Sequence, residues 1–157
     1  MNGADSPVEA TAARFAAGGF RLAEEIRVRE RFDACGIACT SQRLLVGQVL
    51  FARNQHVSAE QLLAMVTATG ARVSKATVYN TLNLFADRGL VRALSLGGEF
   101  TVFDSNTAPH HHLYDEQTGE LCDISPGEVG FARLPSLPAD TELAGLDVVF
   151  RVRRRTP

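Results

Sequence analysis

Three consecutive histidines, His110, His111 and His112, are the residues whose types and spacing point most directly to chemistry. In an extended strand successive side chains point to opposite faces, so His110 and His112 share one face and His111 lies on the other. If residues 116–119 form a hairpin loop, Asp123 stands opposite His112 on the same face of the sheet. Two imidazoles and a carboxylate then converge, which predicts a site for a metal ion.

Two more candidate ligands precede this segment. Asp104 lies six residues before His110, and His56 lies in a turn just before the start of a predicted helix. Such a set of nitrogen and oxygen donors suits a divalent transition metal such as Fe(II) or Mn(II), with Zn(II) as a surrogate and Co(II) of similar chemistry. The set contains no thiolate and so differs from a typical structural zinc site. The alternative is a surface run of histidines beside acids that binds no metal.

The same residues disfavour an enzyme. A mononuclear metal hydrolase needs an open coordination position with a base nearby. Five candidate ligands leave little room for that position, and the sequence has no H-E-x-x-H motif. Cys35, Cys39 and Cys122 cannot supply a four-cysteine zinc centre within one chain. We therefore expect a binding protein without catalytic residues.

The composition is that of an ordinary globular protein, with 157 residues, 45% hydrophobic and 22% charged. No apolar stretch approaches the ~20 residues of a membrane span, and the N-terminus lacks the basic region of a signal peptide. These features predict a cytoplasmic protein without membrane contact. Residues 31–95 hold seven basic and three acidic side chains, whereas residues 108–157 hold five basic and eight acidic ones. The asymmetry indicates two functions, and the basic half is a candidate for binding nucleic acid.

Four helices are predicted after an Ala- and Gly-rich, flexible N-terminal arm at residues 1–19. The first, at residues 20–34, carries apolar residues at Leu22, Ile26 and, less regularly, Val28 and Phe32, and Gly36 ends it. The other three begin at polar caps and span residues 41–52 after Thr40, residues 59–69 after Ser58, and residues 75–87 after Ser74. Gln61 completes a capping box with Ser58.

The last of these helices carries the most information. Val78, Leu82 and Phe85 recur at helical spacing and form one buried stripe, while Tyr79, Asn80 and Asn83 fall on the opposite, polar face. Residues 90–95 and 99–103 then read as two strands around a Gly-Gly turn. Helices followed by such a hairpin predict a winged helix-turn-helix with residues 75–87 as the recognition helix. The alternative is a generic helical hairpin on a small sheet.

The chain is thus expected to be α+β, with an N-terminal winged helix-turn-helix domain and a small C-terminal α/β dimerisation domain. The predicted boundaries are 20–104 for the DNA-binding domain, 105–109 for a hinge, and 110–157 for the dimerisation and metal-sensing domain. In the last domain we expect strands at 110–115, 120–124 and 145–153 and a short helix within 126–132. About 50 residues bury little core by themselves, so a homodimer is predicted.

Residues 36–124 resemble the ferric uptake regulator (Fur) family of dimeric, metal-sensing repressors. The motifs that carry the resemblance are Thr40-Ser-Gln-Arg43, His56-Val-Ser-Ala-Glu60, Ala76-Thr-Val-Tyr-Asn-Thr-Leu82, Phe103-Asp104 and His110-His-His112. The resemblance implies a regulatory metal site on His56, Asp104, His110, His112 and Asp123. It also implies that Tyr79 is the base-contacting tyrosine of the recognition helix. For a palindromic, AT-rich operator on double-stranded DNA we then expect Tyr79 against thymine methyls, Asn80 and Asn83 at base edges, and Lys75, Arg43 and Arg72 at phosphates.

The sequence also departs from the family pattern. Asp115-Glu-Gln-Thr118 stands where most members have a first C-x2-C, so their structural zinc is not expected. Ala38 and Asn80 stand where members often carry a basic residue, and Leu146-Asp-Val-Val lacks a histidine of a further metal site. The pattern is most similar to the iron response regulator (Irr) branch, which implies control of iron homeostasis genes and haem sensing with His111 as the candidate contact. A peroxide-sensing or manganese-responsive repressor, or a protein that buffers haem or metal, are the alternatives.

Overall fold

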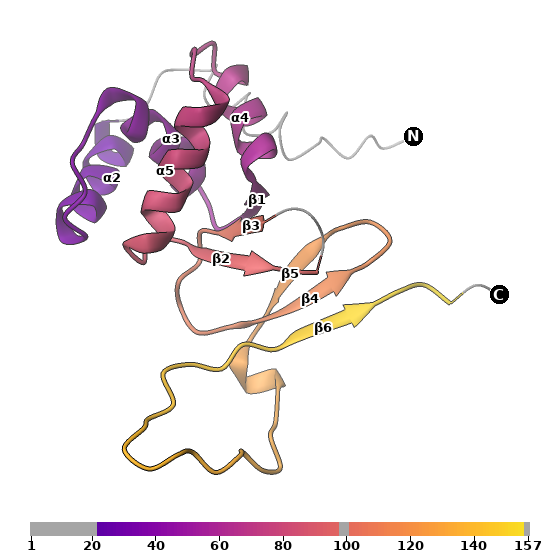
Figure 1. Ribbon diagram of the computed structural model, residues 1–157. Coiled ribbons are helices and arrows are strands. Elements are labelled where there is room, and N and C mark those ends of the chain that lie inside the picture. The colour runs from indigo at the N-terminus through magenta and orange to yellow at the C-terminus, as the bar shows by residue number, and fades with distance from the viewer. Residues whose placement is uncertain (1–21, 98–100, 156–157) are drawn as a thin grey trace. The chain divides into compact units, whose positions relative to one another are not determined.

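The computed structural model describes residues 22–97 and 101–155, which form the α+β fold expected from the sequence (Figure 1). The chain divides into two compact units, residues 1–107 and residues 108–157. The predicted N-terminal arm, 1–19, lies outside the described residues, as do the first two residues of the predicted strand 99–103. Among the described residues, no helix has the length and apolar character that a bilayer crossing requires.

The first unit consists of four helices and a small antiparallel sheet. The helices are α2 (Leu22–Ala34), α3 (Ser41–Phe51), α4 (Ala59–Ala68) and α5 (Lys75–Asp87). The strands are β1 (His56–Ser58), β2 (Arg92–Ser95) and β3 (Thr101–Asp104), in the order β1-β3-β2. Helices α4 and α5 followed by the β2–β3 hairpin give the winged helix-turn-helix.

The helix ends follow the predicted caps. The hydroxyls of Thr40, Ser58 and Ser74 each accept a hydrogen bond from a backbone N–H of the helix that follows. The Ser58 N–H in turn donates to Oε1 of the Gln61 side chain at 2.7 Å, which completes the capping box. Gly36 has φ +63°, a conformation that side chains disfavour, and it follows the end of α2.

Replacing Ser58 with alanine removes this cap without touching the proposed ligands. The N–H of Gln61 then loses its acceptor, so we expect the free energy of unfolding to fall by roughly 0.5–2 kcal/mol. Urea denaturation followed by circular dichroism measures the change. Ser41→Ala, an exposed first-turn position of α3, is the control and is expected to stay within about 0.5 kcal/mol of the parent. Equal stability of the two variants would contradict the prediction.

The core of the first unit lies between α5 and the other helices. Val78, Leu82 and Phe85 are all fully buried, as predicted for the inner stripe of α5. On α2, Val28 and Phe32 are buried, whereas Ile26 is 45% exposed. These two face α3 at Gly47, where an added Cβ would lie only 2.9 Å from Val28 Cγ1 and 3.0 Å from Phe32 Cζ. Close approach of the two helices therefore selects the buried face of α2.

The second unit is built on the mixed sheet β5-β4-β6. Its strands are β4 (His111–Asp115), β5 (Leu121–Ile124) and β6 (Val149–Val152), with one 3-10 turn, η1 (Pro126–Glu128). Strand β5 runs antiparallel to β4, and β6 runs parallel to it. The predicted helix within 126–132 is thus a single short turn. The last strand is shorter than predicted, because it is confined to the residues that pair with residues 112–115 of β4.

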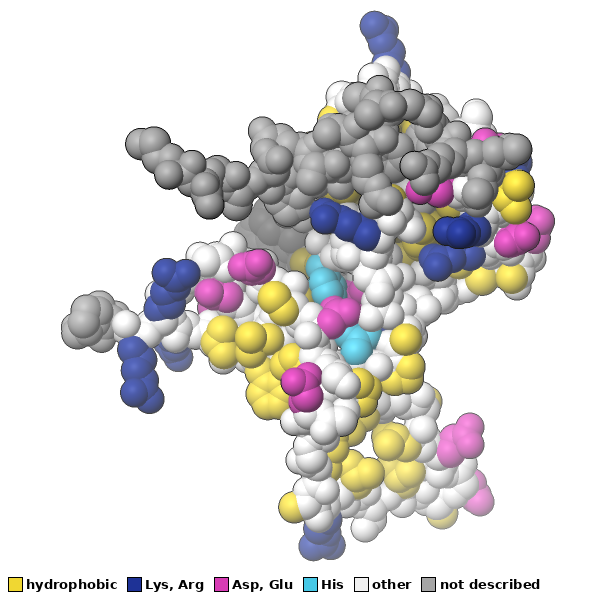
Figure 2. All heavy atoms as spheres, turned by 180° about the vertical axis from the view of Figure 1, so that it is seen from behind, with side chains coloured by type: hydrophobic (Ala, Val, Ile, Leu, Met, Phe, Trp, Pro, Cys, Tyr) yellow, Lys and Arg dark blue, Asp and Glu magenta, His cyan; other side chains and the backbone are white. Residues whose placement is uncertain are grey.

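The described residues of this unit form no apolar core of their own. All buried hydrophobic side chains among the described residues belong to the first unit, between Val28 and Phe103. Figure 2 shows hydrophobic side chains spread over the surface of the second unit. The large hydrophobic residues that lie exposed there are Leu113, Phe131, Leu134, Leu137, Leu143, Leu146, Phe150 and Val152. So much exposed apolar surface on a small unit is typical of a face that a partner covers.

Candidate metal ligands and DNA-binding surface

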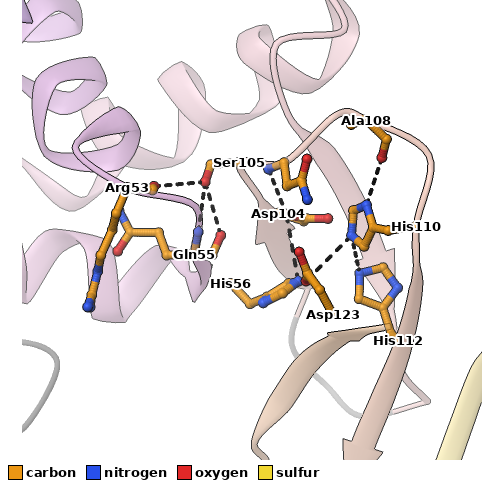
Figure 3. A network of polar contacts seen from close by, with 10 residues as sticks. Arg53, Gln55, His56, Asp104, Ser105, Ala108, His110, His112 and Asp123 are labelled. Carbon is orange, nitrogen blue, oxygen red and sulfur yellow. Dashed lines mark hydrogen bonds and ion pairs between the residues drawn. The ribbon is translucent and has the colours of Figure 1, made fainter. Parts of the chain in front are cut away.

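In the first unit, strand pairing brings two of the predicted ligands together. His56 pairs with Asp104 across β1 and β3, and His56 Nε2 lies 3.6 Å from Asp104 Oδ1 (Figure 3). The predicted turn at His56 is wrong, because His56 begins a three-residue strand. Three residues are too few to show the alternating pattern of a strand in the sequence. The strand is recognised only by its pairing with β3.

Polar contacts fix the backbone on both sides of this pair. The Ser105 hydroxyl accepts the N–H of Gln55 at 2.9 Å, and the Ser105 N–H donates to the Gln55 carbonyl at 3.1 Å. The Gln55 amide donates to the last carbonyls of α3, those of Val49 and Leu50. Asp104 is fully buried, and its Oδ1 also accepts the N–H of Asn106 at 2.8 Å. The pair is therefore held by the fold and not by flexible loops.

In the second unit, His110, His112 and Asp123 lie together on one face. His112 stands opposite Asp123 in the β4–β5 register, which confirms the predicted pairing. The Nε2 atoms of His110 and His112 are 2.9 Å apart, and His110 Nε2 lies 3.6 Å from Asp123 Oδ1 (Figure 3). Two buried imidazoles and a partly exposed carboxylate thus offer donor atoms to a common point.

The hydrogen bonds of His110 define its tautomer. Its Nδ1 lies 2.7 Å from the carbonyl oxygen of Ala108, which can only accept, so Nδ1 carries the proton. In the neutral ring Nε2 is then the lone-pair nitrogen, and this atom faces His112 and Asp123. A carbonyl that orients a histidine through its second nitrogen is a common support for metal ligands. The donor set therefore fits a divalent ion that takes nitrogen and oxygen ligands.

His111 lies on the other face of the sheet. Its ring meets Phe131 edge to face, with centroids 6.1 Å apart. It is buried, and its Nδ1 has no hydrogen-bond partner within the described part of the chain. The alternation of faces predicted for the three histidines is thus present. Haem binding at His111 stays a prediction.

The predicted DNA-reading residues lie along one side of α5. Asn80 and Asn83 are exposed and Tyr79 is half-buried, while the opposite side of the helix is in the core. Arg72 is exposed in the turn before Ser74. Arg43, on α3, is half-buried and donates one guanidinium hydrogen to the Ala38 carbonyl at 2.9 Å.

Glu60, which the sequence analysis did not single out as a site residue, contacts two of these residues. Its carboxylate accepts a hydrogen bond from the Tyr79 hydroxyl and lies 3.1 Å from Lys75 Nζ. The hydrogen bond from Tyr79 and, to a smaller extent, the contact with Lys75 lower the pKa of Glu60 to about 2, so the carboxylate is charged at neutral pH. The hydrogen bond to Glu60 raises the pKa of both Tyr79 and Lys75. The sequence alone does not indicate these contacts of Glu60, because they depend on how α4 packs against α5.

Comparison with known proteins gives concordant matches. Residues 34–131 match the ferric uptake regulator family. The peroxide-responsive repressor PerR of Staphylococcus aureus (strain Mu50) is 34% identical over 89 residues, which are 57% of this chain and 60% of that protein. The chain therefore matches less than two thirds of the length of this relative.

Solved structures agree on the fold. The ferric uptake regulator of Pseudomonas aeruginosa with manganese aligns with a TM-score of 0.66 and 26% identity over 82% of this chain and 98% of that one. The regulator of Vibrio cholerae gives a TM-score of 0.62 and 23% identity over 80% of this chain and 98% of that one. The chain belongs to the ferric uptake regulator family of metal-responsive transcription regulators. This confirms the family expected from the sequence motifs, while the iron response regulator branch stays a prediction.

Proposed function

We propose that this protein is a metal-dependent DNA-binding regulator of iron homeostasis genes, which acts as a homodimer and has no catalytic role. One observation carries the proposal: the chain has a recognition helix with an exposed polar side, and each of its two units also carries a group of His and Asp side chains. His56 and Asp104 belong to the first unit, and His110, His112 and Asp123 belong to the second. The segment that connects the units runs directly between Asp104 and His110.

DNA recognition is assigned to α5 and its surroundings. The Tyr79 ring packs against thymine methyl groups in the major groove, and Asn80 and Asn83 hydrogen-bond to base edges. Lys75, Arg43 and Arg72 contact phosphates, which positions the helix without reading sequence. The exposure of Asn80, Asn83 and Arg72 supports these roles.

Dimerisation is assigned to the second unit. Its described residues bury no hydrophobic side chain, and its sheet has two open edges, β5 and β6. A second copy covers the exposed apolar residues and places two recognition helices at a fixed spacing. Two-fold symmetry in the protein then corresponds to a palindromic operator.

His56 and Asp104 together with His110, His112 and Asp123 would hold one Fe(II) or Mn(II) ion, which would accept nitrogen and oxygen donors from both units. The fold holds the ligands in place within each unit. Strands β1 and β3 fix the His56–Asp104 pair, and β4 and β5 fix the other three ligands. Because one ion would have to bind both sets, metal loading would favour a single arrangement of the units, which we propose is the arrangement that fits the operator.

Operator binding by fluorescence anisotropy tests the function. The duplex is an AT-rich inverted repeat, refined by selection from randomised DNA, and the protein is metal-free, loaded with Mn(II), or loaded and then given haem. We expect Mn(II) to raise the affinity about 5–150-fold. Loss of binding on adding haem would identify a haem-responsive regulator and direct attention to His111. Absence of sequence-specific binding in every state would instead indicate a protein that buffers metal or haem.

A second candidate, a peroxide-sensing repressor, is favoured by the similarity to the peroxide-responsive repressor of Staphylococcus aureus. Its ligand types are the same, so metal-dependent DNA binding does not separate the two. Peroxide treatment of the iron-loaded and the manganese-loaded protein, followed by peptide mass spectrometry, does. A gain of one oxygen atom on His56 or His110, in the iron-loaded sample alone and together with loss of DNA binding, would select the peroxide sensor.

A further inference from the structure

Glu60, Lys75 and Tyr79 contact one another on the surface of the helix-turn-helix. Glu60 lies in the first turn of α4, Lys75 is the first residue of α5, and Tyr79 lies one turn further along α5. The carboxylate contacts both partners, and Lys75 Nζ lies 5.5 Å from the centre of the Tyr79 ring. The Glu60 and Lys75 side chains are 42% and 63% exposed, so the cluster is open to a ligand.

A carboxylate at this position opposes DNA binding in general. It is charged at neutral pH, it repels phosphates, and it competes with a phosphate for the ammonium group of Lys75. As an exposed ion pair it also contributes little to the stability of the fold. Glu60 therefore increases neither the affinity for DNA nor the stability of the fold to any large extent. We look instead for a role in the choice of DNA sequence.

The hydrogen bond to Tyr79 provides that role. The phenol hydroxyl is the far end of the side chain, so an acceptor held there restricts the two torsions that aim the ring. Glu60 is itself held on a helix that starts at the Ser58 capping box. The ring is thus oriented before DNA arrives, which reduces the ordering cost of its contact with a base.

We propose that Glu60 is a positioning residue for specificity: it aims the Tyr79 ring at thymine methyl groups and weakens binding to DNA that offers no such contact. The inference rests on the proposed DNA-binding function. It predicts that Glu60 lowers nonspecific affinity and raises discrimination for the thymine methyl.

Thymine-to-uracil substitution measures that discrimination directly, because it removes only the methyl group. The operator and its deoxyuridine counterpart are compared by anisotropy with the full-length, Mn(II)-loaded protein. Burial of one methyl group corresponds to about a four-fold loss of affinity on substitution. We expect this ratio in the parent protein and a ratio near one in Glu60→Ala, which should also bind random-sequence DNA more tightly.

Three further variants separate orientation from charge. Tyr79→Phe keeps the ring but loses the hydroxyl, so it should lower the ratio as Glu60→Ala does, and the double variant should lower it no further. Glu60→Gln keeps an acceptor for the hydroxyl without the charge, so it should retain the ratio while binding random DNA more tightly. Asp87→Asn removes an exposed charge from the same helix without contacting Tyr79, and it should keep the parental ratio.

The proposal is overturned if Glu60→Ala keeps the parental thymine-to-uracil ratio, or if its effect adds in full to that of Tyr79→Phe. Either result would leave the proposed function intact, because the variants would still bind the operator. Failure of the parent protein to bind any operator would be a failure of the proposed function, seen before any variant is made.

Discussion

His112→Ala is expected to remove the metal response of DNA binding altogether. His112 is fully buried, its Nε2 lies 2.9 Å from that of His110, and it stands opposite Asp123. The change deletes a proposed ligand from the centre of its set, and alanine offers no donor in its place. Loss of residues that merely support metal ligands already costs about 10–100-fold in affinity, so we expect a loss at least that large.

Titration with Mn(II), followed by calorimetry, measures the affinity, and anisotropy measures the gain in operator binding on loading. His111→Gln is the matched control, since it changes the neighbouring residue on the opposite face of β4. The control should keep the Mn(II) affinity and the response, while far-ultraviolet circular dichroism should show both variants folded. A folded His112→Ala protein with parental Mn(II) affinity would show that the metal binds elsewhere.

Phe85→Ala is expected to cause the largest loss of stability in the first unit. The Phe85 ring is fully buried and lies 5.2 Å from the Phe32 ring and 5.7 Å from the Phe51 ring, centroid to centroid. It thus joins α5 to α2 and α3. Truncation leaves a cavity at this junction, and the free energy of unfolding should fall by about 3–5 kcal/mol.

Urea denaturation of the metal-free protein measures this change, so that no metal binding contributes to the result. Ile26→Ala on α2 is the control, because Ile26 is 45% exposed and its truncation should cost less than about 1 kcal/mol. A similar loss of unfolding free energy in the two variants would contradict the prediction, because it would mean that the buried Phe85 ring does not stabilise the core. Operator affinity should fall together with stability in Phe85→Ala, because the same helix carries the proposed base contacts.

Much of the fold could be predicted because local chemistry determines it. The caps at Thr40, Ser58 and Ser74 fix where three helices begin, since each side chain bonds to the backbone a few residues away. The pairing of His112 with Asp123 could be predicted in the same way, because a four-residue loop fixes the register of a hairpin. The family followed from the motifs that these elements carry.

Other features depend on partners far apart in the chain. Strand β1 exists through its pairing with β3, so the sequence around His56 is typical of a turn and does not indicate its register with Asp104. The buried side of α2 depends on Gly47 in α3, which packs against Val28 and Phe32 and leaves Ile26 exposed. Glu60 lies close to Lys75 and Tyr79 only because α4 crosses α5 there.

The helices, the hairpin strands and the residue types available to a metal ion and to DNA could be read from the sequence. They depend mainly on interactions between residues near one another in the chain. Only the folded chain shows which of those residues meet: His56 with Asp104, His110 with His112, and Glu60 with Tyr79. Such contacts arise only when long loops close and helices pack, and the free energy of packing is set by the whole core and by no single segment.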